Sequence, residues 1–151
     1  MNNRRAYGYV LVVLQFSVLL GLIFSSSLLW RLRAGDLLLW LIVGGAIGVG
    51  AAAVVNNRPG NFNIHPSPKS GGSLVTHGIY RYVRHPMYTS ILIFGVACVI
   101  AKQGAATLAL FCMLLGVLFG KARLEEQWLC EKFPGYPAYM KTTRRFLPGI
   151  F

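Results

Sequence analysis

The chain has 151 residues, of which 55% are apolar and only 13% are charged, against roughly 25% charged residues in soluble domains. A soluble protein of this size cannot bury so much apolar surface, so the composition favours an all-α integral membrane protein with one membrane domain over residues 1–151. The net charge of +11 would also suit nucleic-acid binding, but the basic residues lie between apolar blocks rather than on one amphipathic face. A phospholipid headgroup surface accounts better for this charge, so we expect a bilayer and no nucleic acid as partner.

Two apolar blocks open the chain. Residues 7–30 are uncharged, and about 24 such residues cross a hydrocarbon core of roughly 30 Å as one helix. We interpret this block as a retained helix, because it is longer than a signal-peptide core and no clear cleavage site follows it. Residues 37–55 form the second expected span. Its Gly44 and Gly48 either allow close helix approach or are simply tolerated in lipid.

Residues 56–85 change character and are predicted to form a polar cytosolic loop. Pro59, Pro66 and Pro68 prevent a continuous helix there. A loop of this length inside a compact domain usually has a functional reason. It runs directly into residues 78–90, Gly-Ile-Tyr-Arg-Tyr-Val-Arg-His-Pro-Met-Tyr-Thr-Ser, where ionisable groups meet an apolar run. Such groups at a bilayer boundary indicate a binding site, because they cost free energy unless something binds them.

A third helix is expected over residues 86–101, beginning at Pro86. The residue before a proline is pushed toward extended backbone, which places His85 just outside the helix. The unpaired N–H groups of the first turn and the positive end of the helix dipole would then form an anion-binding corner. Arg84, His85 and Tyr88 border this corner.

The fourth expected span, residues 105–120, forms a helical hairpin with the third. Each is about 16 residues or roughly 24 Å long, slightly short for a full crossing, and the last helix is expected to continue in water to about Lys132. Residues 121–151 form the cytosolic C-terminal segment. With both termini cytoplasmic, twelve Lys and Arg residues lie inside and three outside, as the positive-inside rule demands.

Only four acidic residues occur in the chain, and two of them are adjacent. Neighbouring helical residues point about 100° apart, so only one can face a given pocket. We choose Glu125, because Lys121 and Leu129 share its face, and we expect Glu126 to form a surface pair with Arg123. The alternative is that both acids belong to a solvated face that neutralises nearby cations.

Several other chemistries find little support. His77 and His85 have no further ligands at a spacing suited to a metal site, so no metal is expected. The chain has no Gly-x-Ser-x-Gly turn and no phosphate-loop or dinucleotide fingerprint.

The residues Leu-Val-Thr-His-Gly-Ile-Tyr-Arg-Tyr-Val-Arg-His-Pro-Met-Tyr are followed about 37 residues later by Glu-Glu-Gln-Trp-Leu-x₃-Phe-Pro-Gly-Tyr-x-x-Tyr. This pattern resembles the isoprenylcysteine carboxyl methyltransferase family and the related phospholipid N-methyltransferases, over roughly residues 72–148. The resemblance implies a membrane methyltransferase that depends on S-adenosylmethionine. By matching motif it implies cofactor contacts from the following residues: Gly72, Ser73, Leu74, Val75, Tyr80, Arg84, His85, Pro86, Met87, Tyr88 and Glu125.

The resemblance also implies a catalytic group on the last helix, made of Glu125, Lys121 and the nearby Arg123. The family usually has an arginine at the position of Lys121, where it acts on the substrate. Two further departures are Ser90, where the motif commonly ends in glycine, and a Phe-Pro-Gly sequence in place of Phe-Gly.

The chemistry of the residues agrees with this assignment. The α-carboxylate of S-adenosylmethionine suits the N–H corner, and its positive groups suit Glu125. A carboxylate acceptor arrives ionised, whereas an amine must first lose a proton to a base, so a lipidic or lipid-attached carboxylate is favoured. The open alternatives are a phospholipid amine N-methyltransferase, an NADPH-dependent membrane reductase and a non-catalytic membrane partner. Oligomeric state does not follow from the sequence.

Overall fold

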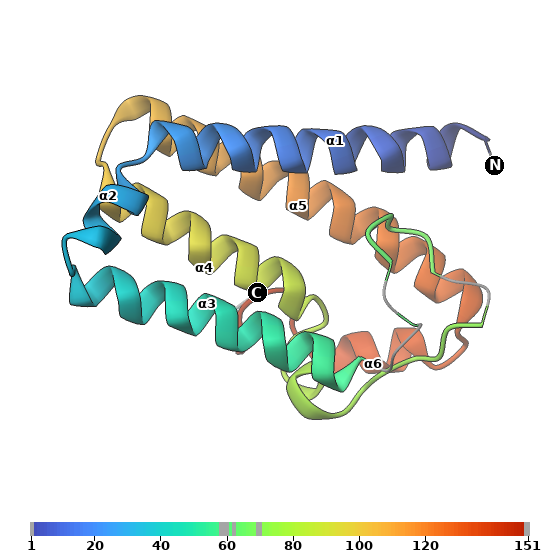
Figure 1. Cartoon of the computed structure of the whole chain (residues 1–151). Coiled ribbons are helices and arrows are strands. Elements are labelled where there is room, and N and C mark those ends of the chain that lie inside the picture. The colour runs from blue at the N-terminus through green and yellow to red at the C-terminus, as the bar shows by residue number, and fades with distance from the viewer. Residues whose placement is uncertain (1, 58–60, 62, 69–70, 150–151) are drawn as a thin grey trace.

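The computed structural model describes residues 2–57, 61, 63–68 and 71–149, and its elements are all helical (Figure 1). Apart from one isolated bridge between Val83 and Arg144, these ranges contain no strand pairing. Arg58, Pro59 and Lys69, which entered the sequence predictions, lie outside the described residues. The helices are α1 (Asn2–Ser25), α2 (Leu28–Arg33), α3 (Leu37–Asn56), η1 (Gly78–Arg81), α4 (Pro86–Ala101), α5 (Ala105–Lys132) and α6 (Tyr136–Thr142).

The chain is an all-α integral membrane protein, as its composition predicted. Within the described ranges α1, α3 and α5 are long and apolar enough to cross a bilayer, and α4 is a shorter apolar helix of 16 residues. Large apolar side chains such as Phe24 and Val55 are more than four-fifths exposed, an arrangement that suits a lipid surround. The predicted hairpin is confirmed, because α4 ends at Ala101 and α5 begins at Ala105 and ends at the expected Lys132.

The prediction of one helix over residues 7–30 is wrong. The helix α1 ends at Ser25, and a separate short helix begins at Leu28. The hydroxyls of Ser25 and Ser26 donate to the carbonyls of Leu22 and Ile23, at 3.1 and 3.0 Å. Serine side chains that bond to nearby backbone in this way compete with helix continuation, which accounts for the break.

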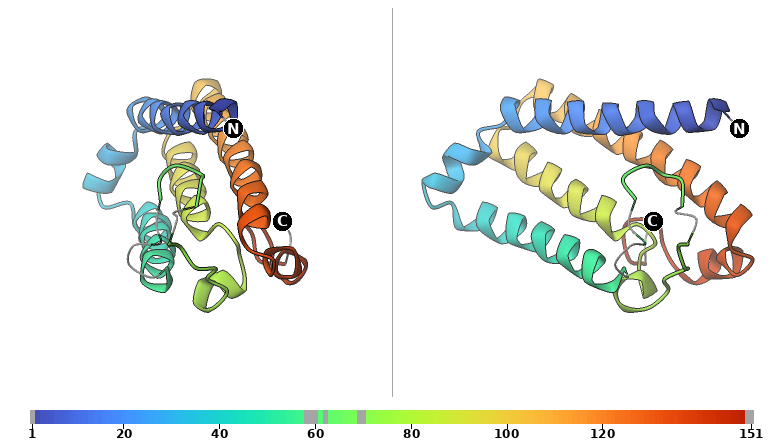
Figure 2. Two further views of the ribbon diagram at one scale, coloured as in Figure 1. Left: turned by 90° about the vertical axis from the view of Figure 1, so that its right-hand side faces the viewer. Right: turned by 45° about the vertical axis from the view of Figure 1, so that its right-hand side comes forward.

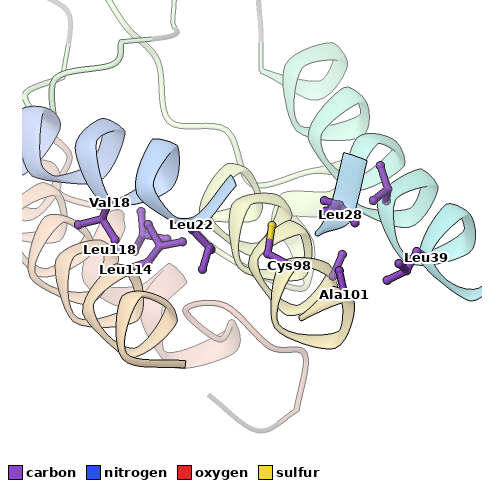
Figure 3. Packing of buried hydrophobic residues seen from close by; sticks show 10 residues of the cluster. Val18, Leu22, Leu28, Leu39, Cys98, Ala101, Leu114 and Leu118 are labelled. Carbon is purple, nitrogen blue, oxygen red and sulfur yellow. The ribbon is translucent and has the colours of Figure 1, made fainter. Parts of the chain in front are cut away.

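The apolar helices α1, α3, α4 and α5 converge at one end of the molecule and separate toward the other (Figures 1 and 2). The helix α1 packs along α5, and α3 packs along α4. Where they converge, Leu22, Cys98 and Leu114 are fully buried in one apolar cluster (Figure 3). The polar connection between α3 and α4 lies at the separated end, together with α6, so this end carries the polar site.

Small residues bring α3 and α4 together, and of the two alternatives for Gly44 and Gly48 the structure favours simple tolerance in lipid. A Cβ on Gly44 or Gly48 would meet nothing within 4 Å, so in the described part of the chain these glycines do not mediate close packing. Gly50 does, because its Cβ would lie 2.9 Å from the Ser90 hydroxyl. That hydroxyl donates to the Ala46 carbonyl at 2.7 Å. The serine that departs from the family motif is therefore accommodated as a helix-to-helix contact.

Gly78 holds the connection against the end of α3, and we expect its substitution by alanine to destabilise the protein. Its φ of +59° lies in the left-handed region, and a Cβ there would overlap the side-chain amide of Asn56. The left-handed conformation alone costs an alanine roughly 1–2 kcal/mol, so Gly78→Ala should cost about 2 kcal/mol or more. Thermal unfolding in detergent measures this. Gly71→Ala is the matched control, because a Cβ there meets open space; equal melting temperatures for the two variants would contradict the prediction.

Candidate active site

A cavity of about 480 Å³ lies at the separated end of the helices. Its walls come from α1, the α3 to α4 connection, the start of α4, the second half of α5, and α6. Arg123 is the one predicted site residue that does not line it. The predicted residues that do are Gly72, Ser73, Leu74, Val75, Tyr80, Arg84, His85, Pro86, Met87, Tyr88, Lys121 and Glu125.

The helix α4 begins at Pro86, with His85 outside it at φ −123°, as the sequence predicted. Fewer N–H groups remain for an anion at the start of α4 than the sequence predicted. The His85 carbonyl accepts from both the Tyr88 and the Thr89 N–H groups, at 3.0 Å each. Since proline has no N–H, Met87 supplies the first-turn donor that remains for an anion.

Residues 143–146 run beside residues 83–85 and fix the loop that enters α4. The Arg84 N–H donates to the Arg144 carbonyl at 2.8 Å, and the His85 N–H donates to the Arg145 carbonyl at 3.1 Å. The Thr89 hydroxyl also donates to the Phe146 carbonyl at 2.8 Å. These backbone contacts join segments about 60 residues apart, and no side-chain pattern in the sequence indicated them.

Glu126 is buried inside this junction, so both sequence interpretations of it, a surface pair with Arg123 and a solvated face, are wrong. It is 4% exposed. Its carboxylate accepts from Arg84 Nε at 2.9 Å, from Arg145 Nη2 at 2.6 Å and from His85 Nε2 at 3.3 Å. The predictions failed because residue spacing along a helix shows only which residues of that helix are neighbours. The partners of Glu126 come from other segments of the chain.

The two arginines among the predicted site residues lie in different places. The Arg84 guanidinium is bound to Glu126 and donates to the Thr143 carbonyl at 2.5 Å. The exposed Arg123 lies with its guanidinium 4.4 Å from the centre of the Phe119 ring. Arg84 thus holds the cavity wall together, and Arg123 lies outside the cavity.

Glu125 faces the cavity, as the choice between the two adjacent acids predicted. The Tyr88 hydroxyl donates to Glu125 Oε2 at 2.8 Å, and His85 Nδ1 lies 3.5 Å from the same oxygen. The Glu125 side chain is 30% exposed, so it remains accessible to a ligand. These contacts join the start of α4 to the second half of α5.

His85 lies between the two carboxylates, with its ring stacked on Tyr88 at 5.2 Å between centroids. Burial by itself would lower the pKa of His85, but the hydrogen bonds to Glu125 and Glu126 outweigh it and raise that pKa above 6.5. The environment therefore favours the imidazolium, which can donate from both nitrogens at once.

This raised pKa predicts how stability depends on pH. A group whose pKa is higher in the folded than in the unfolded protein stabilises fully below the unfolded pKa, and the contribution is lost as pH rises through the folded value. The melting temperature should therefore fall as pH rises above about 6.5, and His85→Asn should flatten that fall. Thermal unfolding of both proteins in detergent from acid to alkaline pH measures it. A wild-type melting temperature that rises over this window, relative to the variant, would contradict the prediction.

The tyrosines around the cavity remain neutral hydrogen-bond donors. Burial and the nearby Glu125 raise the pKa of Tyr80, and burial raises the pKa of Tyr139 to about 12. The Tyr139 hydroxyl donates to the Tyr80 carbonyl at 2.5 Å. Neither phenol is therefore a base near neutral pH.

Several polar residues that sequence reasoning did not single out also line the cavity, among them Asn61 and Gln15. Asn61 Oδ1 accepts from the Ser73 N–H, and Asn61 Nδ2 donates to the Ser73 carbonyl, each at 2.9 Å. This paired contact holds residues 72–75 along the cavity wall. An asparagine in a polar loop carries no signal of such a partner twelve residues away.

Fold and site together define a class: helical membrane proteins with a cavity between a proline-started helix and a glutamate-bearing helix extension. A sequence model of the phospholipid methyltransferase family matches residues 30–135, more than half of the chain. The chain belongs to this family.

Curated relatives agree with this membership. The chain is 32% identical over 79 residues to a probable protein-S-isoprenylcysteine O-methyltransferase of Oryza sativa, covering 51% of this chain and 41% of that protein. It is 26% identical over 112 residues to protein-S-isoprenylcysteine O-methyltransferase A of Arabidopsis thaliana, covering 73% and 57%. It is also 28% identical over 149 residues to the cobalt-zinc-cadmium resistance protein CzcN of Cupriavidus metallidurans, covering 98% and 66%. The chain thus spans about half the length of these relatives.

Proposed function

We propose that the protein is an S-adenosylmethionine-dependent methyltransferase that acts at the cytoplasmic face of the membrane on the carboxylate of a lipidic or lipid-attached acceptor. The observation that carries the proposal is the composition of the cavity. One part presents Glu125, Tyr88 and His85, and another is lined by the apolar side chains of membrane helices α1 and α4. A polar donor and an apolar acceptor can therefore meet in one space.

The residues present fit the donor. Glu125 is an accessible carboxylate in a strongly basic chain, which suits the ammonium and sulfonium groups of S-adenosylmethionine. The Met87 N–H at the α4 start suits its carboxylate. The ring of Tyr80 and the backbone of residues 72–75 offer a stacking face and hydrogen-bonding groups for adenine. When bound, the cofactor would supply a methyl group on a positively charged sulfur.

The apolar wall supports a lipid-attached acceptor. Phe16, Leu19 and Ile91 line it, and all three lie within membrane-spanning or apolar helices. The relatives named protein-S-isoprenylcysteine O-methyltransferase favour an oxygen acceptor on such a group. A carboxylate oxygen also needs no general base, which agrees with the neutral tyrosines and the paired His85.

The protein would then act mainly by aligning the methyl donor with the acceptor. Methyl transfer is an in-line displacement, so holding the methyl group and the acceptor oxygen in line supplies much of the rate. Glu125 and Tyr88 orient the donor, Lys121 lies beside the acceptor path, and the loop held by Asn61 excludes water. Residues 83–85, fixed by residues 143–146, keep this arrangement rigid.

The test is methyl transfer by the purified protein in detergent or lipid nanodiscs, with labelled S-adenosylmethionine and an S-prenylated cysteine carboxylate as acceptor. We expect label in a base-labile methyl ester. Label in the amine of phosphatidylethanolamine would favour the phospholipid N-methyltransferase alternative. Binding of NADPH without S-adenosylmethionine would favour the reductase, and binding of neither would favour the non-catalytic partner.

Orientation has a separate test. The twelve-to-three distribution of basic residues supports cytoplasmic termini. Single cysteines at exposed positions beside the site, such as Gln127, in a variant whose native Cys98, Cys112 and Cys130 are replaced by alanine, should react with an impermeant reagent only when the cytoplasmic face is open to it.

A further inference from the structure

The helix α1 contributes one buried polar side chain to the cavity, that of Gln15. It is 4% exposed, although α1 is otherwise strongly apolar at this depth. Its Oε1 accepts from Lys121 Nζ at 2.6 Å, and Lys121 is 2% exposed. The two residues are 106 positions apart in the chain, so the fold brings a buried amide and a buried ammonium together in the cavity wall.

Lys121 differs from the other buried cations of the site in its partners. Arg84, Arg145 and His85 all contact the carboxylate of Glu126. In the part of the chain that the structure describes, no carboxylate forms an ion pair with Lys121. Besides Gln15, its ammonium faces the ring of Tyr88, 5.3 Å from the centroid. The Glu125 carboxylate also attracts this ammonium, without forming an ion pair with it. A buried ammonium whose hydrogen-bond acceptor is a neutral amide still carries a cost that a bound anion would reduce.

The Gln15–Lys121 pair lies close both to the groups proposed to bind S-adenosylmethionine and to the apolar wall proposed for the acceptor. The hydroxyl of Tyr88 donates to Glu125, whereas the ring of Tyr88 faces Lys121. Gln15 is followed on α1 by Phe16 and Leu19, which form the apolar wall. The ammonium therefore lies between the carboxylate end of the cavity and its lipid-facing end.

We propose that Gln15 is a positioning residue that holds the Lys121 ammonium charged and aimed into the cavity, and so makes the acceptor site select an anion over a neutral or cationic group. This inference rests on the proposed function. An amide oxygen accepts one of the three N–H groups of a lysine and leaves the others, with the full charge, to the acceptor. A glutamate at the same position would neutralise the ammonium.

The test compares the KM of the S-prenylated cysteine carboxylate, as acceptor, with the inhibition constant of the corresponding uncharged carboxamide, as its competitor, in the methyl-transfer assay. The wild-type protein should prefer the carboxylate by at least about tenfold, that is about 1.4 kcal/mol. Gln15→Glu should abolish that preference and raise the KM for the carboxylate acceptor about tenfold. Its Kd for S-adenosylmethionine should stay within about twofold of wild type. A purely structural role would not separate acceptor from donor in this way.

Two variants serve as controls. Gln103→Glu makes the same change at an exposed position in the α4 to α5 hairpin and should leave both constants unchanged. Lys121→Met should raise the acceptor KM by itself, and adding the uncharged Gln15→Met to it should raise the KM little further, because Gln15 acts through Lys121.

Failure of this inference can be distinguished from failure of the proposed function. Unchanged carboxylate preference in Gln15→Glu, with S-adenosylmethionine binding intact, overturns the inference. If Gln15→Glu does not fold, Gln15→Met decides, since it removes the amide without adding charge. A raised acceptor KM with intact donor binding then supports the inference, and a wild-type KM overturns it. Absence of methyl transfer and of donor binding in the wild-type protein would instead contradict the proposed function itself.

Discussion

Replacement of Glu126 by glutamine should lower the free energy of unfolding by about 3–5 kcal/mol, the cost of breaking a buried ion pair by removing one partner. The carboxylate is 6% exposed and is shared by Arg84, Arg145 and His85. A glutamine of the same shape leaves these cations without a counter-charge. Thermal and denaturant unfolding in one detergent, at a pH near 6, measures the loss.

The control for this prediction is Glu131→Gln. Glu131 pairs with Arg4 at 2.6 Å, but the two side chains are 59% and 53% exposed. Exposed pairs contribute about 0–1 kcal/mol, so this variant should unfold close to wild type. If Glu126→Gln and Glu131→Gln lost the same small amount, the buried carboxylate would not be the centre of the junction.

Replacement of Glu125 by glutamine should act on binding rather than on folding. The side chain is 30% exposed, and a glutamine oxygen can still accept from the Tyr88 hydroxyl. The loss of a charge partner for the ammonium and sulfonium of the donor should weaken S-adenosylmethionine binding by about 30-fold or more, or roughly 2 kcal/mol. Equilibrium binding of the labelled donor to the purified protein measures this.

Glu131→Gln again provides a variant with the same change of charge, placed outside the lining of this cavity. It should bind the donor like wild type. The site assignment would be overturned if Glu125→Gln bound S-adenosylmethionine with wild-type affinity. A large fall in its melting temperature would also contradict the separation between Glu125, which faces the ligand, and Glu126, which holds the fold.

Local rules predicted much of this architecture. The start of α4 at Pro86 follows from the fixed φ of proline and its missing N–H. The apolar blocks, the hairpin before Ala105 and the end of α5 at Lys132 follow from composition and turn residues. Adjacent helical residues point about 100° apart, so only one of the two acids could share a face with Lys121 and Leu129. This reasoning correctly predicted that Glu125 faces the cavity.

The same rules failed where partners come from distant segments. The Glu126 carboxylate accepts hydrogen bonds from Arg84 and Arg145, which are 42 and 19 residues away in the chain. A helical wheel of α5 cannot show these partners, because neither lies on α5. The backbone pairing of residues 143–146 leaves no trace in side-chain pattern, because any residue can make it. Gln15 is one polar residue in an apolar stretch of sequence, and only the fold shows that Lys121 lies beside it.

The backbone pairing of residues 83–85 with residues 143–146 also constrains the order of biogenesis. The apolar helices α1, α3, α4 and α5 precede residues 143–146 in the chain, so they can insert while the loop before α4 still lacks this neighbour. Membrane integration and ligand competence should therefore be separate events during synthesis. A version of the chain truncated after α5 should therefore insert into the membrane without an assembled binding site.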